Sequence, residues 1–183
     1  MRSPNYFIVT PKNNQKYNNT KVIGDQEVII NDNISDGHST NREAVVLETP
    51  MAYKGSVNIG DTIIVHHNTF RQTRDMKNKL THGKLIKDNM YWVDDYYLHI
   101  DKIGNINSKA PYVFIEPRFK EDSLTGHKDY DNAGEVIYTS PELEELDIKK
   151  GKIFAFKEGL NATYSVDGKD YFRVKYTNLL AEL

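Results

Sequence analysis

Short runs of β-branched and aromatic residues alternate with polar, turn-forming stretches along most of the chain. The runs at Phe7–Pro11, Thr62–Val65 and Ile153–Phe156 have the length and composition of strands. Only Pro141–Leu146 has helical character, with Ser140 at the N-cap position and Pro141 at the first helical position. The pattern predicts an all-β chain with long loops and one helical turn.

The strand pattern occurs twice, which makes an internal repeat the main organising feature. Glu43–Val65 aligns without a gap with Gly134–Phe156. The positions that shape the backbone pair as Val45 with Val136, Pro50 with Pro141, Val57 with Ile148 and Gly60 with Gly151. Phe7–Pro11 likewise matches Val113–Pro117, and Met90–Ile100 matches Tyr171–Ala181. We therefore expect two domains, residues 1–104 and 110–183, joined by the polar segment GNINSKAP.

Composition narrows the class of protein. The formal net charge of −2 argues against a general nucleic-acid or membrane-surface binder. The absence of cysteine excludes a disulfide framework and thiolate chemistry. No apolar run approaches the ~20 residues that span a bilayer, and the N-terminal MRSPNYFIV lacks the apolar core of a signal peptide. The expectation is a soluble cytoplasmic protein.

Each copy contains the same turn before its central strand. Gly60 in Val57–Asp61 and Gly151 in Ile148–Gly151 stand where a tight turn needs positive φ. Near the end of copy two, Val166–Tyr171 predicts a hairpin with Asp-Gly at its tip. A β-turn followed by a strand is common in barrels, so the order of these parts is more informative than any one of them.

In order, copy two gives GEVIYTSP, IKKGKIFAF and YSVDGKDYFRVKYTNLLAEL. This order resembles the GroES family of co-chaperonins, which combines a G-E-V strand, a V-x-x-G-D turn and strand, and a hairpin that leads into a closing strand. Copy one resembles the same family through FIVTP, REAVVLETP, VNIGDTIIV and MYWVDDYYLHI. The resemblance implies two tandem GroES-like small β-barrels with Greek-key-type connections.

The resemblance also implies a mobile loop after the first strand, carrying an apolar tripeptide that docks on the chaperonin. In copy one this loop is residues 12–41, and Val28, Ile29 and Ile30 occupy the tripeptide position. The alternative interpretation is that these three residues form an ordinary core strand. The loop of copy two, RFKEDSLTGHKDYDNA, is shorter and offers only Leu124 as a contact. We expect it to bind a chaperonin weakly or not at all.

The function implied is that of a co-chaperonin: a homo-oligomeric ring that caps a GroEL-type chaperonin and assists ATP-dependent protein folding. Such a protein is not an enzyme and needs no cofactor, because the partner chaperonin binds the ATP. Low Arg with high Lys and Asn suggests an AT-rich, phage-like genome. Two alternatives remain open. One is a β-rich phage structural or assembly module that does not bind chaperonin. The other is a nucleic-acid binder that stacks bases on Tyr91, Trp92, Tyr96 and Tyr97. The competing interpretation of these aromatic residues is that they form a barrel core and a subunit interface.

Other candidate chemistry is weak. His66 and His67 are adjacent, so in a strand they would face opposite sides and could not hold one metal ion. The basic segment Thr69–Lys79 suggests either nucleic-acid contact or a solvated insertion, and copy two lacks an equivalent. The sequence contains no G-x-S-x-G, P-loop or G-x-G-x-x-G motif. We expect neither catalysis nor metal binding.

Overall fold

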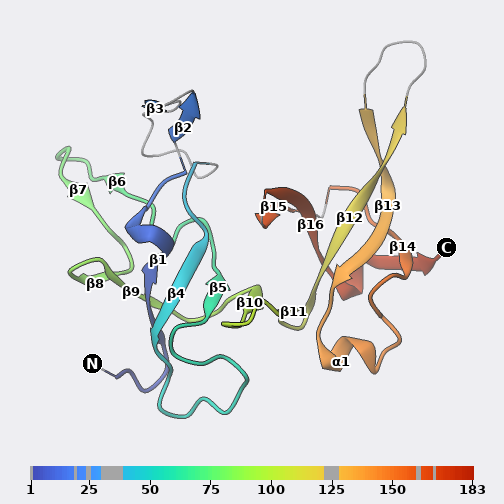
Figure 1. The fold of residues 1–183 in the computed structure, drawn as a ribbon, viewed down its shortest axis with the longest axis horizontal. Coiled ribbons are helices and arrows are strands. Elements are labelled where there is room, and N and C mark those ends of the chain that lie inside the picture. The colour runs from blue at the N-terminus through green and yellow to red at the C-terminus, as the bar shows by residue number, and fades with distance from the viewer. Residues whose placement is uncertain are drawn as a thin grey trace. The chain divides into compact units, whose positions relative to one another are not determined.

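The computed structural model describes residues 2–18, 20–23, 26–29, 39–121, 128–159, 162–166 and 168–183. The chain divides into two compact units, Met1–Asn105 and Ile106–Leu183 (Figure 1). The protein is mostly β, close to the all-β class predicted from the sequence, and its sheets are antiparallel. The α-helix in the described ranges, α1 (Pro141–Glu144), is one turn long and begins at Pro141 after Ser140.

The main sheet of the first unit contains the strand order β10-β5-β4-β1-β9-β8. Its strands are β1 (Phe7–Pro11), β4 (Glu43–Glu48), β5 (Thr62–Ile64), β8 (Leu85–Lys87), β9 (Met90–Val93) and β10 (Leu98–Ile100). The short strand β11 (Ile106–Ser108) begins the second unit. Two separate hairpins join β2 (Thr20–Ile23) to β3 (Gln26–Ile29) and β6 (Thr73–Arg74) to β7 (Leu80–Thr81). A short 3-10 turn, Lys12–Asn14, follows β1.

The sheet of the second unit has the order β15-β16-β12-β13-β14-β17. Its strands are β12 (Tyr112–Glu121), β13 (Lys128–Tyr138), β14 (Ile153–Phe156), β15 (Ala162–Val166), β16 (Lys169–Lys175) and β17 (Leu179–Glu182), with a 3-10 turn at Tyr176–Asn178. Among the described residues neither sheet closes on itself, because each strand order ends in two different edge strands.

The two units repeat one strand order. The order β10-β5-β4-β1-β9-β8 in the first unit has its counterpart in β17-β14-β13-β12-β16-β15 in the second. Phe7 pairs with Val93 as Val113 pairs with Val174, which confirms the alignment of these residues made from the sequence. The end of the second outer window is wrong by two residues, because His99 pairs with Ile63 as Glu182, not Leu180, pairs with Phe154. Gly60 and Gly151 have φ of 90° and 86°, as their turns require.

A β-bulge occurs at the same place in both units. In β1 the register shifts between Ile8 and Val9, and in β12 it shifts between Phe114 and Ile115. A bulge bends its strand and increases the local twist, and it is a feature that related folds retain. Its repetition indicates that the two units share backbone detail as well as strand order.

The gapless alignment of the central windows is wrong by one residue along β4 and β13. Val9 pairs with Val46, and its counterpart Ile115 pairs with Val136, so Val136 corresponds to Val46 rather than to Val45. A one-residue shift moves every side chain to the opposite face of a strand. Val46 and Val136 are both fully buried, whereas Val45 is only partly buried. The second unit therefore has one additional residue between this strand and the turn at Gly151.

The cores correspond position by position. Each unit encloses one cluster of buried apolar side chains. The equivalent members are Phe7 and Val113, Val9 and Ile115, Val46 and Val136, Val57 and Ile148, Val65 and Phe156, Tyr91 and Phe172, and Val93 and Val174. Substitutions between the copies change the size of a side chain but keep it apolar, which preserves a packed interior.

The loop expected after Pro117 in copy two is mostly strand. β12 continues to Glu121 and β13 begins at Lys128, so the pair forms a long ribbon, visible in Figure 1. Pro117 lacks a backbone donor, and the ladder shifts register there and resumes at Phe119. Leu124 lies outside the described residues. No helix in the described ranges is long and apolar enough to cross a membrane.

Candidate docking hairpin

The predicted docking residues lie on the hairpin of β2 and β3. These strands pair antiparallel from Thr20 opposite Ile29 to Ile23 opposite Gln26. They form a two-stranded sheet of their own, separate from the main sheet of the first unit (Figure 1). The sequence predicted an apolar segment in a long loop but did not predict this hairpin.

The apolar side chains of β3 are open to solvent. Val28 is 41% exposed and Ile29 is 65% exposed. The alternative interpretation of these two residues as an ordinary core strand is therefore wrong. Ile30, the third member of the predicted tripeptide, lies outside the described residues. An exposed pair of β-branched side chains on a projecting hairpin is a surface that a partner can bury.

The base of the connection between β1 and β4 is held firmly. Tyr17 and Thr40 form an isolated β-bridge, beside which the Asn18 amide donates to the Ser39 carbonyl (2.7 Å) and the Asn41 amide donates to the Lys16 carbonyl (2.9 Å). These residues bring the two arms of the connection together, so the docking hairpin leaves the unit from a defined stem.

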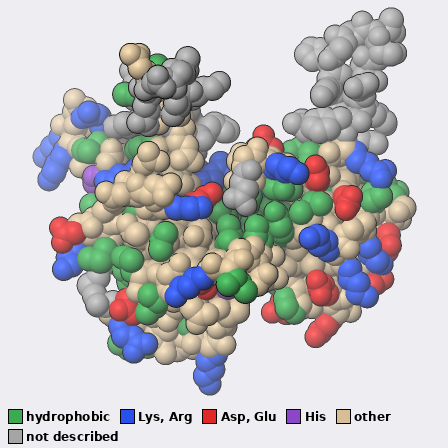
Figure 2. Space-filling model, in the orientation of Figure 1, with side chains coloured by type: hydrophobic (Ala, Val, Ile, Leu, Met, Phe, Trp, Pro, Cys, Tyr) green, Lys and Arg blue, Asp and Glu red, His purple; other side chains and the backbone are tan. Residues whose placement is uncertain are grey.

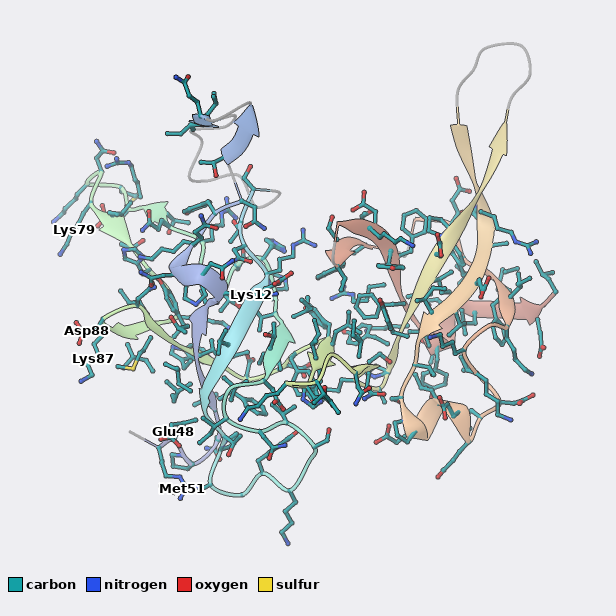
Figure 3. All side chains as sticks on the ribbon, in the orientation of Figure 1. Lys12, Glu48, Met51, Lys79, Lys87 and Asp88 are labelled. Atoms are coloured by element: carbon teal, nitrogen blue, oxygen red, sulfur yellow. The ribbon has the colours of Figure 1, made fainter. Side chains whose placement is uncertain are left out.

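Asn41 organises this stem. Its side chain is almost wholly buried and donates to the carbonyls of Lys12 (3.3 Å) and Gln15 (2.8 Å), while its Oδ1 accepts from the Glu43 amide (2.9 Å). Lys12, labelled in Figure 3, forms an ion pair with Glu43 at 2.5 Å. A buried polar side chain that satisfies three backbone groups fixes the local geometry.

Tyr17 connects the stem to a second insertion. Its hydroxyl oxygen accepts a hydrogen bond from the Gln72 amide at 2.8 Å, next to β6. Burial of the phenol raises the pKa of Tyr17 above its ordinary value, so the group stays neutral under physiological conditions. The docking hairpin and the β6–β7 hairpin are thus joined at their bases.

The histidine pair does not have the geometry that the sequence suggested. His66 and His67 follow β5, and their ring centroids lie only 4.0 Å apart instead of on opposite faces of a strand. His66 Nδ1 accepts from the Asn68 amide at 3.1 Å. Among the described residues, no group of three or more His, Asp or Glu side chains is placed to hold a metal ion.

The aromatic residues considered for base stacking are not arranged as one surface. Tyr91 and Tyr96 belong to the core of the first unit, and Tyr97 is also buried. Trp92 is partly exposed, with the Tyr6 ring centroid 4.9 Å away and Lys84 Nζ 4.6 Å above its ring. The hypothesis that these four residues form one base-stacking surface is therefore wrong.

Trp92 instead lines an apolar pocket that sequence analysis missed. The pocket has a volume of about 350 Å³ and lies beside β1, β8 and β9, with Tyr6, Ile8, Ile86 and Trp92 among its lining residues. Arg2 also lines it and reaches Glu48 at 3.8 Å. The residues come from three separate stretches of sequence, so only the strand order reveals that they meet.

The first unit also contains a buried polar pair. His99 Nε2 lies 2.7 Å from Asp61 Oδ2, and both side chains are almost wholly buried. The carboxylate also accepts from the Asn58 amide (2.8 Å), and His99 Nδ1 lies 3.4 Å from Ser56 Oγ. Because a carboxylate only accepts, Nε2 donates to it. The order Ser, His, Asp is that of a hydrolytic triad.

The second unit indicates a structural role for this pair. Asp61 directly precedes β5 and Lys152 directly precedes β14, while His99 pairs with Ile63 as Glu182 pairs with Phe154. Lys152 Nζ lies 2.8 Å from Glu182 Oε2. The equivalent positions thus hold an acidic and a basic side chain in both units, with the two exchanged. In each unit the pair links the turn before the central strand to the strand next to it, β10 or β17.

A scan against protein-family models found no match to this chain. A search of curated proteins likewise found none.

Proposed function

We propose that the protein is a co-chaperonin that caps a GroEL-type chaperonin and assists ATP-dependent protein folding. The observation that carries the proposal is the exposed apolar pair Val28 and Ile29 on a hairpin that projects from a hydrogen-bonded stem. Recognition through a short apolar segment in a groove requires such a presentation. Ile30 extends the segment in sequence.

The repeated topology supports a tandem GroES-like architecture. Each unit has six strands in equivalent order, an equivalent bulge and an equivalent Gly-containing turn. In the proposal, each sheet curls around its own core as a small, incompletely closed Greek-key-type barrel. The long connection after the first strand carries the docking segment in the first unit.

The energetics of one docking segment require several copies to act together. Burying Val28 and Ile29 is worth roughly 1.5–3 kcal/mol for each side chain. Ordering a flexible segment on binding costs about 2–5 kcal/mol. One segment would therefore bind weakly, whereas a ring that presents several gains on the order of 10²–10⁴ in avidity.

Two surfaces favour self-association into such a ring. β17 is an edge strand with exposed Leu180, and an open edge with apolar side chains pairs readily with another chain. The apolar pocket at Tyr6, Ile8 and Trp92 is a second surface that a neighbouring copy could cover. We place the ring in the cytoplasm, that of the host if the protein is phage-encoded.

The test is co-sedimentation of the purified protein with a GroEL-type chaperonin, with ATP, with ADP and without nucleotide. The proposal requires co-migration that depends on nucleotide, since the partner binds the ATP and changes its docking surface. A folded oligomer that fails to bind under all three conditions would overturn the proposal. That result would favour a β-rich phage structural or assembly module.

A further inference from the structure

The segment between β5 and β8 is an insertion specific to the first unit. It runs from Ile64 to Leu85, whereas the equivalent connection in the second unit runs only from Phe156 to Ala162. The insertion carries the β6–β7 hairpin, in which Thr73 pairs with Thr81 and Arg74 with Leu80. Phe70 in this segment packs in the core of the first unit, with its ring centroid 4.9 Å from that of Tyr91. Among the described residues, the β6–β7 hairpin itself contributes no side chain to that core cluster.

The hairpin is exposed except at its last residue, Thr81, which is half-buried. All residues from Thr73 to Leu80 are exposed, and Met76 at the tip is fully so. Its shape is nevertheless defined. The Thr73 and Thr81 hydroxyls lie 2.9 Å apart, and the Asp75 carboxylate accepts from the amides of Lys77 (2.9 Å) and Lys79 (2.8 Å). The hairpin therefore presents its outer side chains in a preformed arrangement.

Those side chains are strongly basic. The hairpin, residues 73–81, contains three Lys or Arg and one acidic residue, in a chain whose net charge is −2. The single carboxylate, Asp75, is engaged in the turn, and in the described part of the chain Arg74, Lys77 and Lys79 form no ion pair. Figure 2 shows Lys and Arg side chains gathered over this hairpin, and Figure 3 labels Lys79 at its outer end.

The basic hairpin stands next to the docking hairpin. The Gln72 amide, one residue before β6, donates to the Tyr17 hydroxyl in the docking stem. Burial, and to a smaller extent the charge on nearby Lys16, lowers the pKa of His82, which follows β7. Both insertions therefore leave the first unit from one place, and a partner that buries Val28 and Ile29 comes close to the basic hairpin.

We propose that the β6–β7 hairpin makes a second contact with the same partner, on an acidic protein surface that borders the groove taking the apolar segment. This inference rests on the proposed function. Lys77 and Lys79 supply long-range attraction, and Met76 supplies an apolar contact at the tip. Charge complementarity of this kind mainly accelerates association and fixes the orientation of docking.

The test compares two double charge reversals in the full-length protein. Lys77→Glu with Lys79→Glu changes the hairpin, while Lys54→Glu with Lys102→Glu makes the same charge change at other exposed positions of the first unit. Association with a GroEL-type chaperonin is measured at low and at physiological salt. The hairpin variant should associate about tenfold more slowly at low salt and lose most of its salt dependence. The control variant should stay close to the wild type.

The outcomes separate this inference from the proposed function. If the wild type binds the chaperonin and the two variants associate equally fast, the proposed second contact is wrong. The proposed co-chaperonin function is unaffected by that result. If the wild type does not bind, both fail. A fluorescein-labelled single-stranded oligonucleotide is titrated in parallel. If the wild type binds the oligonucleotide and the hairpin variant does not, the partner of the hairpin is a nucleic acid rather than an acidic protein surface.

Discussion

His99 donates to Asp61 across 2.7 Å inside the first unit, and the equivalent positions of the second unit hold Glu182 and Lys152 at 2.8 Å. The identity of the acid and the base is exchanged, yet the connection is preserved. In each unit the contact links the turn before the central strand to the strand that closes the sheet. The two pairs differ in burial, because Asp61 and His99 are enclosed whereas Lys152 and Glu182 are partly exposed.

This difference predicts unequal effects of removing one partner. His99→Ala leaves the Asp61 carboxylate buried without its ring donor, which should lower the free energy of unfolding by about 3–5 kcal/mol. Lys152→Ala should cost much less, because solvent stabilises the exposed partner. Urea unfolding of both variants measures the contrast, and His99→Gln, which retains a donor, should recover part of the loss. Equal losses in the two Ala variants would contradict this account.

Gly134 and Ala44 occupy equivalent positions, opposite Pro117 and Pro11. A Cβ on Gly134 would lie 2.5 Å from Ile115 Cγ2 and would also overlap the Glu116 carbonyl. Gly134→Ala should therefore destabilise the protein by about 1–3 kcal/mol through overpacking. Ala44→Gly, the matched change in the first unit, should cost about 1 kcal/mol or less. Thermal unfolding of the two variants checks the order, and a neutral Gly134→Ala would be inconsistent with the close approach.

Tyr17→Phe removes the hydroxyl that accepts from the Gln72 amide. Loss of this hydrogen bond should lower stability by about 0.5–1.5 kcal/mol and should speed hydrogen exchange at the Gln72 amide. Exchange at amides of the second unit serves as the internal control. Unchanged protection at Gln72 would mean that the two insertions are not joined through Tyr17.

A pH effect is expected at Asp147. Hydrogen bonds from Lys152 and Lys149 hold the pKa of Asp147 at about 2, below its ordinary value of 3.8. Because the folded state has the lower pKa, the stabilisation is present above the unfolded value and is lost as pH falls through about 2. Lys152→Ala should raise the pKa of Asp147 toward 3.8, as followed by NMR titration of its carboxyl group. High salt should act in the same direction, and a titration curve insensitive to both changes would refute the assignment.

The sequence predicted the strands and the repeat well because apolar positions and turn glycines determine them locally. Phe7 with Val113 and Val93 with Val174 were aligned correctly. The central window was misaligned by one residue because Pro50 and Pro141, outside the strands, were matched without a gap. Only backbone pairing distinguishes Val45 from Val46 as the counterpart of Val136.

The sites were less predictable because they depend on register and packing. Asp61 and His99 are 38 residues apart and meet only because His99 pairs with Ile63. The exposure of Val28 and Ile29 follows from a hairpin that packs as its own small sheet, which composition alone does not distinguish from a core strand. The pocket at Trp92 depends on β8 and β9 flanking β1.

The most direct test of the central claim compares two variants, Ile29→Asp and Met51→Asp. Each is assayed for nucleotide-dependent co-sedimentation with a GroEL-type chaperonin. The two parent side chains are matched, at 65% and 60% exposed, and Met51, labelled in Figure 3, lies far from the docking hairpin in sequence. Both variants should keep the wild-type circular dichroism and oligomeric state. Ile29→Asp should abolish co-sedimentation and Met51→Asp should retain it. Wild-type binding by Ile29→Asp would contradict the assignment of the docking segment.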